Sequence, residues 1–208
     1  DVAQVFDFIE RPFINTHFHH LLVAPNDMRQ PLYQMINKEI RLARAGKDAF
    51  IRLKLNHVVD EKMVAKLYEA CTAGVRVELC LRGNCSLIPG VPGYSEGLFI
   101  NAIISRYLEH SRIYIFGNDG EPKYYIGSTA WMTRNLDRRI EVMTPVYDPD
   151  IQRELDFVIS AGLRDTEQGY YTNGEEVRPR REDIDDKTEL FNSQQTLYQY
   201  YVAKKKEE

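Results

Sequence analysis

The stretch AFIRLKLNHVVDEKMVAKLYEACTAGVRVELCLRG, residues 49–83, decides the fold. Its first eight residues, AFIRLKLN, predict a strand, and VRVELCLRG at its end predicts a second one. Between them, apolar residues recur at helical spacing after Asp60, which suits an N-cap, and Gly74 suits the helix end. A strand, a helix and a strand in this order predict two parallel strands with the helix on one face of the sheet.

The same alternation extends toward the N-terminus. HFHHLLVAP, residues 17–25, predicts a short strand that ends at Pro25. A helix is expected from Asn26 or Asp27 to about Ala45, with Gly46 as its stop. This alternation indicates an α/β fold with a mixed, mainly parallel sheet flanked by helices.

The second half of the chain adds further elements. SRIYIFGNDGEPKYYIGS, residues 111–128, predicts a β-hairpin. INAIIS, residues 100–105, and RRIEVMTPVY, residues 138–147, predict further strands, and Pro149 opens a helix to about Ser160. The polar segment Gly169–Asp186 is expected to be a linker or surface arm, followed by a C-terminal helix over about Lys187–Ala203. We therefore divide the chain into an α/β domain, residues 1–163, and a linker with a C-terminal helix, residues 164–208.

Composition limits the classes of function. The 208 residues carry a net charge of −4, which argues against a generally basic nucleic-acid-binding protein. A polyanion site must therefore be a local cluster of Arg and Lys. Three cysteines without CxxC spacing argue against a disulfide framework or a zinc site and fit a reducing compartment. No apolar run reaches the ~18 residues of a membrane span, so stable membrane insertion is not expected. We expect a cytoplasmic location, with peripheral attachment to the inner membrane left open.

His110 is the first candidate for chemistry. It lies two residues before Arg112, and past the hairpin come Gly127 and Ser128. An imidazole can attack phosphorus at neutral pH because its pKa lies near 6.5. The spacing resembles the HxK…GS pattern of phospholipase D-like phosphotransferases, with Arg112 in place of Lys. The alternative is a strand-edge histidine that hydrogen-bonds the backbone.

Two basic residues near strand ends are candidate phosphate ligands. Arg82 follows the strand VELCL, and ligands of parallel sheets gather beyond the carboxyl ends of strands. Lys54 lies inside an apolar strand and needs an anion or a partner. The alternatives are that Arg82 forms a surface salt bridge and that Lys54 lies on a solvent-exposed strand edge. A metal role for His17, His19 and His20 is not expected, because no third ligand is evident.

Three stretches together resemble the polyphosphate kinase family: LKLNHVVDEKMVAKLYEACTAGVRVELCLRGNCSLIPG, RYLEHSRIYIF and STAWMTRNLDRRIEVMTPVYDP. The resemblance implies that this chain is the second of two phospholipase D-like domains, with Arg82 and His110 contacting nucleotide phosphates. It implies reversible transfer of the ATP γ-phosphate to polyphosphate through a phosphohistidine. The phosphorylated histidine and the Mg²⁺ ligands would lie in the preceding domain, outside this chain.

The resemblance also sets the expected partners and the rival functions. ATP or ADP and inorganic polyphosphate are the expected substrates, with the preceding domains of the same polypeptide as partners in a homo-oligomer and no nucleic acid. One rival is a phospholipase D-like phosphodiesterase, which needs a lysine where this chain has Arg112. The other is a nucleotide- or polyphosphate-binding module without activity of its own. The isolated chain is expected to be inactive.

Overall fold

The computed structural model describes residues 1–14, 16–172, 176–185 and 187–207. At its centre, β2 (Phe50–Leu55) and β3 (Arg76–Leu81) run parallel, with Leu55 beside Leu81. The connecting helix α3 (Glu61–Thr72) begins where the Asp60 side chain accepts a hydrogen bond from the backbone N–H of Met63. The strand–helix–strand unit predicted over residues 49–83 is confirmed.

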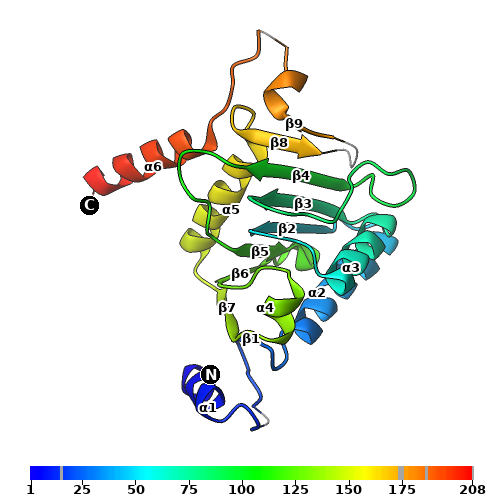
Figure 1. Ribbon diagram of the computed structural model, residues 1–208, viewed down its shortest axis with the longest axis vertical. Coiled ribbons are helices and arrows are strands. Elements are labelled where there is room, and N and C mark those ends of the chain that lie inside the picture. The colour runs from blue at the N-terminus through cyan, green and yellow to red at the C-terminus, as the bar shows by residue number, and fades with distance from the viewer. Residues whose placement is uncertain (15, 173–175, 186, 208) are drawn as a thin grey trace.

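One sheet contains all the described strands, in the order β1-β7-β6-β5-β2-β3-β4-β8-β9 (Figure 1). Only β2 with β3 and β3 with β4 pair in parallel, so the α/β class is confirmed but the mainly parallel sheet is not. The reason is the antiparallel meander β5-β6-β7 on one side of β2 and the antiparallel strands β8 and β9 beyond β4. The remaining strands are β1 (Leu22–Ala24), β4 (Leu98–Ile103), β5 (Ile113–Phe116), β6 (Lys123–Gly127), β7 (Glu141–Val146), β8 (Gly169–Thr172) and β9 (Val177–Pro179).

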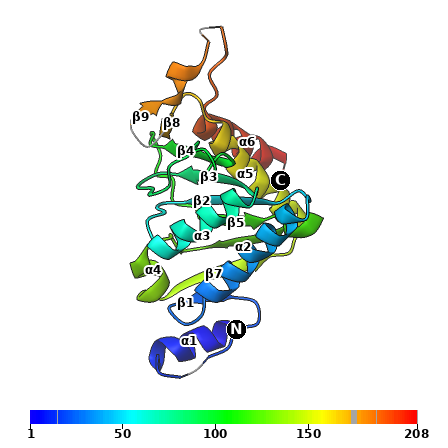
Figure 2. The same cartoon turned by 90° about the vertical axis from the view of Figure 1, so that its right-hand side faces the viewer.

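Helices cover both faces of the sheet (Figures 1 and 2). On one face lie α2 (Arg29–Arg44) and α3, and on the other lies α5 (Pro149–Arg164). The C-terminal helix α6 (Ser193–Glu207) packs against α5. Two short helices are α1 (Val2–Glu10) near the N-terminus and α4 (Thr133–Asp137) before β7. The predicted helices therefore exist, and the C-terminal one begins at Ser193 rather than Lys187.

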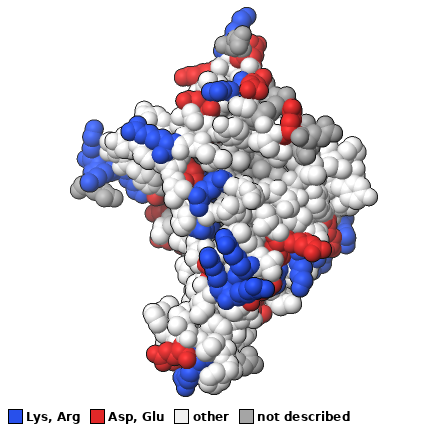
Figure 3. Space-filling model, in the orientation of Figure 1, with Lys and Arg blue, Asp and Glu red and all other residues white. Residues whose placement is uncertain are grey.

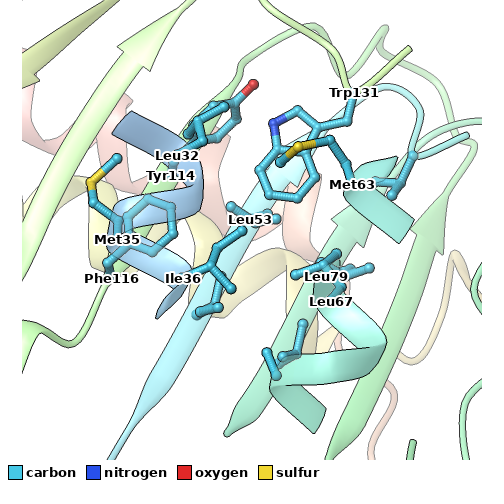
Figure 4. Close-up of a cluster of buried hydrophobic side chains, with 14 of the residues drawn as sticks. Leu32, Met35, Ile36, Leu53, Met63, Leu67, Leu79, Tyr114, Phe116 and Trp131 are labelled. Carbon is cyan, nitrogen blue, oxygen red and sulfur yellow. The ribbon is translucent and has the colours of Figure 1, made fainter. Parts of the chain in front are cut away.

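The main core lies between the sheet and the helices α2 and α3 (Figure 4). Each fully buried aliphatic side chain there contributes roughly 1.5–3 kcal/mol. Figure 4 shows this cluster, which holds Leu32 and Ile36 of α2, Met63 and Leu67 of α3, Leu53 and Leu79 of the central strands, and the aromatic residues Tyr114 and Trp131. A second cluster packs α5 on the opposite face through Ile159 and Leu163.

The segment expected to be a linker contributes two strands. β8 pairs with β4 through Tyr170 and Ala102, and β9 extends the edge of the sheet. Arg180 donates a hydrogen bond of 2.8 Å to the carbonyl of Leu163. The sequence analysis missed these strands because the segment is polar. An edge strand needs little alternation of apolar and polar residues. Residues 173–175 and 186 of that segment lie outside the described residues, and the boundary between residues 163 and 164 stays a prediction.

None of the helices in the described part of the chain combines the length and the apolar character that a membrane span requires.

Candidate functional site

The carboxyl ends of β2 and β3 form one rim of the sheet, and the start of β5 and the end of β6 meet them there. β5 runs antiparallel to β2, so its first residue, Ile113, pairs with Lys54 near the end of β2. Ile126 of β6 pairs with Ile113 in turn. The rim therefore gathers Arg82, His110, Arg112 and Ser128, which follow or precede these strand ends. Arg82 and His110, which the resemblance assigns to nucleotide phosphates, therefore lie at the same rim.

Arg82 presents its guanidinium at this rim. Its Nε donates a 3.0 Å hydrogen bond to Oδ1 of Asn56, which is buried at the end of β2. In the part of the chain that the structure describes, neither terminal nitrogen of Arg82 has a hydrogen-bond or ion-pair partner. A guanidinium that is held at Nε and free at both ends suits bidentate binding of a phosphate.

The His110 side chain is exposed, and contacts with Arg112 set the orientation of its imidazole ring. One terminal nitrogen of Arg112 donates to the carbonyl oxygen of His110 at 2.5 Å and lies 3.0 Å from His110 Nδ1. Since an arginine can only donate, Nδ1 is the acceptor, and the neutral ring carries its proton on Nε2. The positive charge of Arg112, with slight burial and the charge of Arg82, lowers the pKa of His110. His110 therefore offers a neutral Nε2–H at the rim.

Arg112 itself is half-buried between the rim and the interior. Burial lowers its pKa, while the charge of Glu141 opposes this effect. Its buried Nε has no hydrogen-bond partner within the described residues. A buried donor without a hydrogen bond is costly, and a negative charge near the half-buried guanidinium would offset part of the cost of burying its charge. Arg112 is therefore suited to hold both His110 and a bound phosphate.

His57 is a second imidazole at the rim, and the sequence analysis missed it. The backbone N–H of Asn84 donates to His57 Nδ1 at 3.0 Å, so this ring also carries its proton on Nε2. The ring lies against Gly83, where a Cβ would come within 2.3 Å of Cε1. Burial, followed by the charges of Arg82, Arg134 and Arg112, lowers the pKa of His57. Its position directly after the strand AFIRLKLN was the signal that could have revealed it.

Ser128 and Lys54 lie at or behind the rim and have partners within the chain. The Ser128 hydroxyl donates to Glu141, which also accepts a 2.6 Å hydrogen bond from Asn135. Lys54 is only 4% exposed, and its Nζ lies 2.7 Å from Glu109 Oε2 and 3.5 Å from Cys80 Sγ. The anion that Lys54 needs is therefore Glu109. A direct phosphate contact by Lys54 would require this buried pair to break.

The rim is basic and lacks a carboxylate set. Figure 3 shows Lys and Arg side chains gathered in the middle of the molecular face seen in Figure 1. Over the described residues, no group of three or more His, Cys, Asp or Glu side chains is placed to hold a metal ion. The site is suited to bind a polyanion by its arginine and imidazole donors.

The N-terminal histidines contact one another and a tyrosine. His17 and His19 lie edge to face, with ring centroids 5.5 Å apart, and His20 Nδ1 contacts the Tyr147 hydroxyl at 2.9 Å.

Sequence comparison relates this chain to known proteins. The family model described as polyphosphate kinase C-terminal domain 2 matches residues 21–194. The polyphosphate kinase of Escherichia coli (strain K12) is 44% identical over 175 residues, which is 84% of this chain and 25% of the relative. The polyphosphate kinase of Parasynechococcus marenigrum is 43% identical over 199 residues, 95% of this chain and 28% of the relative. This chain spans about a quarter of the length of these relatives.

Structure comparison points to the same family as sequence comparison. The crystal structure of polyphosphate kinase from Porphyromonas gingivalis superposes with a TM-score of 0.91 at 31% identity, covering 100% of this chain and 32% of that one. A phospholipase D family member, Nuc from Salmonella typhimurium, superposes with a TM-score of 0.53 at 14% identity. That match covers 73% of this chain and 96% of Nuc, and it shows a shared fold.

Proposed function

The chain belongs to the polyphosphate kinase family, and on this premise we propose that it supplies one part of the active site of an ATP–polyphosphate phosphotransferase. The complete enzyme would transfer the ATP γ-phosphate reversibly to inorganic polyphosphate through a phosphohistidine. Because this chain spans about a quarter of its relatives, the phosphorylated histidine would lie in a preceding domain of the same polypeptide.

The observation that carries the proposal is the convergence of donors at one rim. Arg82 has both terminal nitrogens free among the described contacts, Arg112 has an unused buried Nε, and His110 offers Nε2–H. These groups bind and neutralise phosphate oxygens, which is most of the work in phosphoryl transfer. His110 acts here as a hydrogen-bond donor to phosphate rather than as the nucleophile, because Arg112 occupies Nδ1 and the proton is on Nε2.

Lys54 and Ser128 support the rim from within the chain. Lys54 neutralises Glu109, so this carboxylate does not compete with phosphate for the arginines. Ser128 holds Glu141 beside the rim in the same way. Their contribution to phosphate binding is therefore mainly indirect.

The remaining components come from outside this chain. ATP and ADP fit the donor set described above. Mg²⁺ does not fit the rim by itself, since the nearby carboxylate of Glu141 is engaged by Ser128 and Asn135, so its ligands would come from another domain. We also propose that the complete protein is a cytoplasmic homo-oligomer without stable membrane insertion or nucleic-acid binding. Residues 1–163 would form the catalytic domain, and residues 164–208 its C-terminal extension.

The test uses the full-length protein with γ-labelled ATP. We expect polyphosphate synthesis in the wild type, and a loss of roughly 100-fold in kcat/KM for ATP in both Arg82→Ala and His110→Ala. Arg44→Ala, an exposed arginine at the end of α2, is the matched control. His110→Ala should still form phosphohistidine, because the nucleophile lies elsewhere. Phosphodiester cleavage without synthesis, or ATP binding without turnover, would contradict the proposed function.

A further inference from the structure

The residue next to His110, Glu109, is held at both carboxylate oxygens. Lys54 Nζ of β2 lies 2.7 Å from Oε2, and Gln194 Nε2 of α6 lies 2.8 Å from Oε1. The Glu109 side chain is 14% exposed and that of Lys54 is 4% exposed. A buried carboxylate with both oxygens satisfied is fixed in direction, and it fixes the backbone that carries His110.

Gln194 also holds the backbone of the loop three residues before His110. Its Oε1 accepts the N–H of Tyr107 at 2.9 Å, and its Nε2 donates to the carbonyl of Tyr107 at 2.8 Å. One buried amide therefore makes three hydrogen bonds to residues 107 and 109, although it is more than 80 positions away in the sequence.

Apolar packing does little to hold this loop. Between β4 and β5, Ile104, Tyr107 and Leu108 are 67%, 52% and 72% exposed. A segment without buried apolar anchors relies on its polar contacts for a defined conformation. The contacts from Gln194 and Lys54 are therefore the main constraint on the stretch that leads into His110.

Gln194 is itself fixed by the end of α5. The preceding residue, Ser193, donates from its N–H and its hydroxyl to Oδ2 of Asp165, at 2.7 and 2.6 Å. Asp165 is completely buried, and its Oδ1 accepts the N–H of Gln168 at 2.7 Å. The first turn of α6 is thus anchored before it reaches the loop, so Gln194 can act as a rigid support.

We propose that Gln194 and Lys54 are positioning residues for His110, and that the start of α6 is consequently part of the nucleotide-phosphate site. This inference rests on the proposed function, because it assigns His110 a phosphate contact. Without the Gln194 amide, Tyr107 and Glu109 lose three hydrogen bonds, and the imidazole moves away from the phosphate it should meet.

The experiment measures KM and kcat for ATP in the full-length protein. Gln194→Ala should raise KM for ATP about tenfold, with kcat changed less than about threefold, because a ground-state phosphate contact is weakened. A merely structural defect would reduce the amount of active enzyme, and thus kcat, without changing KM. Gln195→Ala is the matched control, since the Gln195 side chain is exposed on the same helix turn and, among the described residues, makes no hydrogen bond to the loop.

A double-mutant cycle then separates the inference from the proposed function. His110→Ala should raise KM, and adding Gln194→Ala to it should raise KM no further, because both changes remove the same contact. Independent, multiplicative effects would overturn the positioning role, as would a wild-type KM in Gln194→Ala beside an impaired His110→Ala. An unchanged kcat/KM for ATP in His110→Ala would instead contradict the proposed function and the inference with it.

A second variant covers the case in which Gln194→Ala does not fold. Gln194→Glu keeps the size and the acceptor for Tyr107 but removes the amide donor to Glu109 and to the Tyr107 carbonyl. Its KM for ATP should also rise about tenfold. Hydrogen exchange of the peptide spanning residues 104–112 should become faster than in Gln195→Ala, and unchanged exchange would contradict the proposal.

Discussion

At the scale of single residues, the rim combines the imidazoles of His57 and His110 with the guanidiniums of Arg82 and Arg112. Hydrogen bonds at Nδ1 orient both rings, from Asn84 to His57 and from Arg112 to His110. Burial and then positive neighbours lower the pKa of His57, and mainly the charge of Arg112 lowers the pKa of His110. Both rings are therefore neutral at a pH where a free histidine would begin to take up a proton. Phosphate binding would reverse this effect, because an added negative charge favours the protonated ring.

The lowered pKa of His57 makes the stability of the free protein depend on pH. The folded state binds a proton on His57 less readily than the unfolded chain, whose histidine pKa is near 6.5. As pH falls through that value, the unfolded state takes up more protons and stability falls. We expect His57→Gln to flatten the decline in unfolding free energy between pH 7 and 5, by at most about 1.4 kcal/mol per pH unit.

Urea unfolding of this chain at several pH values measures the effect. His17→Gln, at an exposed histidine of the N-terminal segment, is the control. An equal pH slope in the wild type and in His57→Gln would refute the prediction.

Asp60 carries a structural prediction. Burial by itself would raise its pKa, but hydrogen bonds from Arg29, Thr133 and the Met63 N–H hold the pKa at about 2. Arg29 reaches both oxygens of the carboxylate, at 2.8 and 2.7 Å, so Asp60 joins α2, α3 and α4. Asp60→Asn breaks a buried ion pair and should cost about 3 kcal/mol of unfolding free energy at pH 7.

The sign of its pH dependence follows from the lowered pKa. Asp60 stabilises the fold above the unfolded pKa of 3.8, and this contribution is lost as pH falls toward about 2. The gap between wild type and Asp60→Asn should therefore narrow in acid. Asp48→Asn, at an exposed carboxylate, is the control. A difference below about 1 kcal/mol at pH 7 would argue against the role assigned to Asp60.

At the scale of elements, local signals succeeded where a segment is long and periodic. The helix expected from Asn26 or Asp27 to Ala45 is α2, Arg29–Arg44, and the predicted hairpin is β5 with β6. The strands β8 and β9 were missed, because they pair at an edge of the sheet and lack an apolar face. The local sequence pattern also could not predict strand direction. The antiparallel pairing of β2 with β5 depends on tertiary structure, because the two strands are far apart in the sequence.

Gly127 shows how closely two of these elements approach. A Cβ at this position in β6 would lie 2.0 Å from the Val142 carbonyl oxygen and 2.8 Å from the Met143 Cα in β7. Backbone atoms cannot move aside without separating the strands. Gly127→Ala should therefore destabilise the fold by about 3 kcal/mol, as measured by urea unfolding. It should also disturb the adjacent Ser128–Glu141 contact. A stable variant with wild-type activity would show that β6 and β7 can separate at little cost.

At the scale of the whole molecule, the sequence allowed one part of the site to be predicted and left another part hidden. Arg82 and His110 follow from strand ends and from the family resemblance, and both lie on the predicted rim. Gln194 was hidden because its contacts to Tyr107 and Glu109 join residues that are far apart in the sequence and meet only in the folded chain. The partner of Lys54 was hidden for the same reason. Long-range polar contacts leave no periodic signal in a sequence.

The incomplete site leads to the prediction with the widest reach: the isolated 208-residue chain should not synthesise polyphosphate, although the full-length protein should. Phosphoryl transfer needs a nucleophile, charge neutralisation and usually a metal ion. The rim supplies charge neutralisation through Arg82, Arg112 and His110. Under the proposed function His110 donates to phosphate through Nε2–H, because Arg112 lies at its Nδ1, and the nucleophile lies outside this chain.

Labelled phosphate from ATP checks this prediction directly. The full-length protein should become labelled on histidine and form polyphosphate, whereas the isolated chain should do neither, even when it is folded. The isolated chain should still bind ATP weakly, because Arg82 keeps its free guanidinium ends, and Arg82→Ala should abolish that binding. A fragment that makes polyphosphate or becomes phosphorylated on His110 would refute the two-domain site, since the nucleophile would then lie in this chain and Arg112 would have to release the His110 ring during turnover.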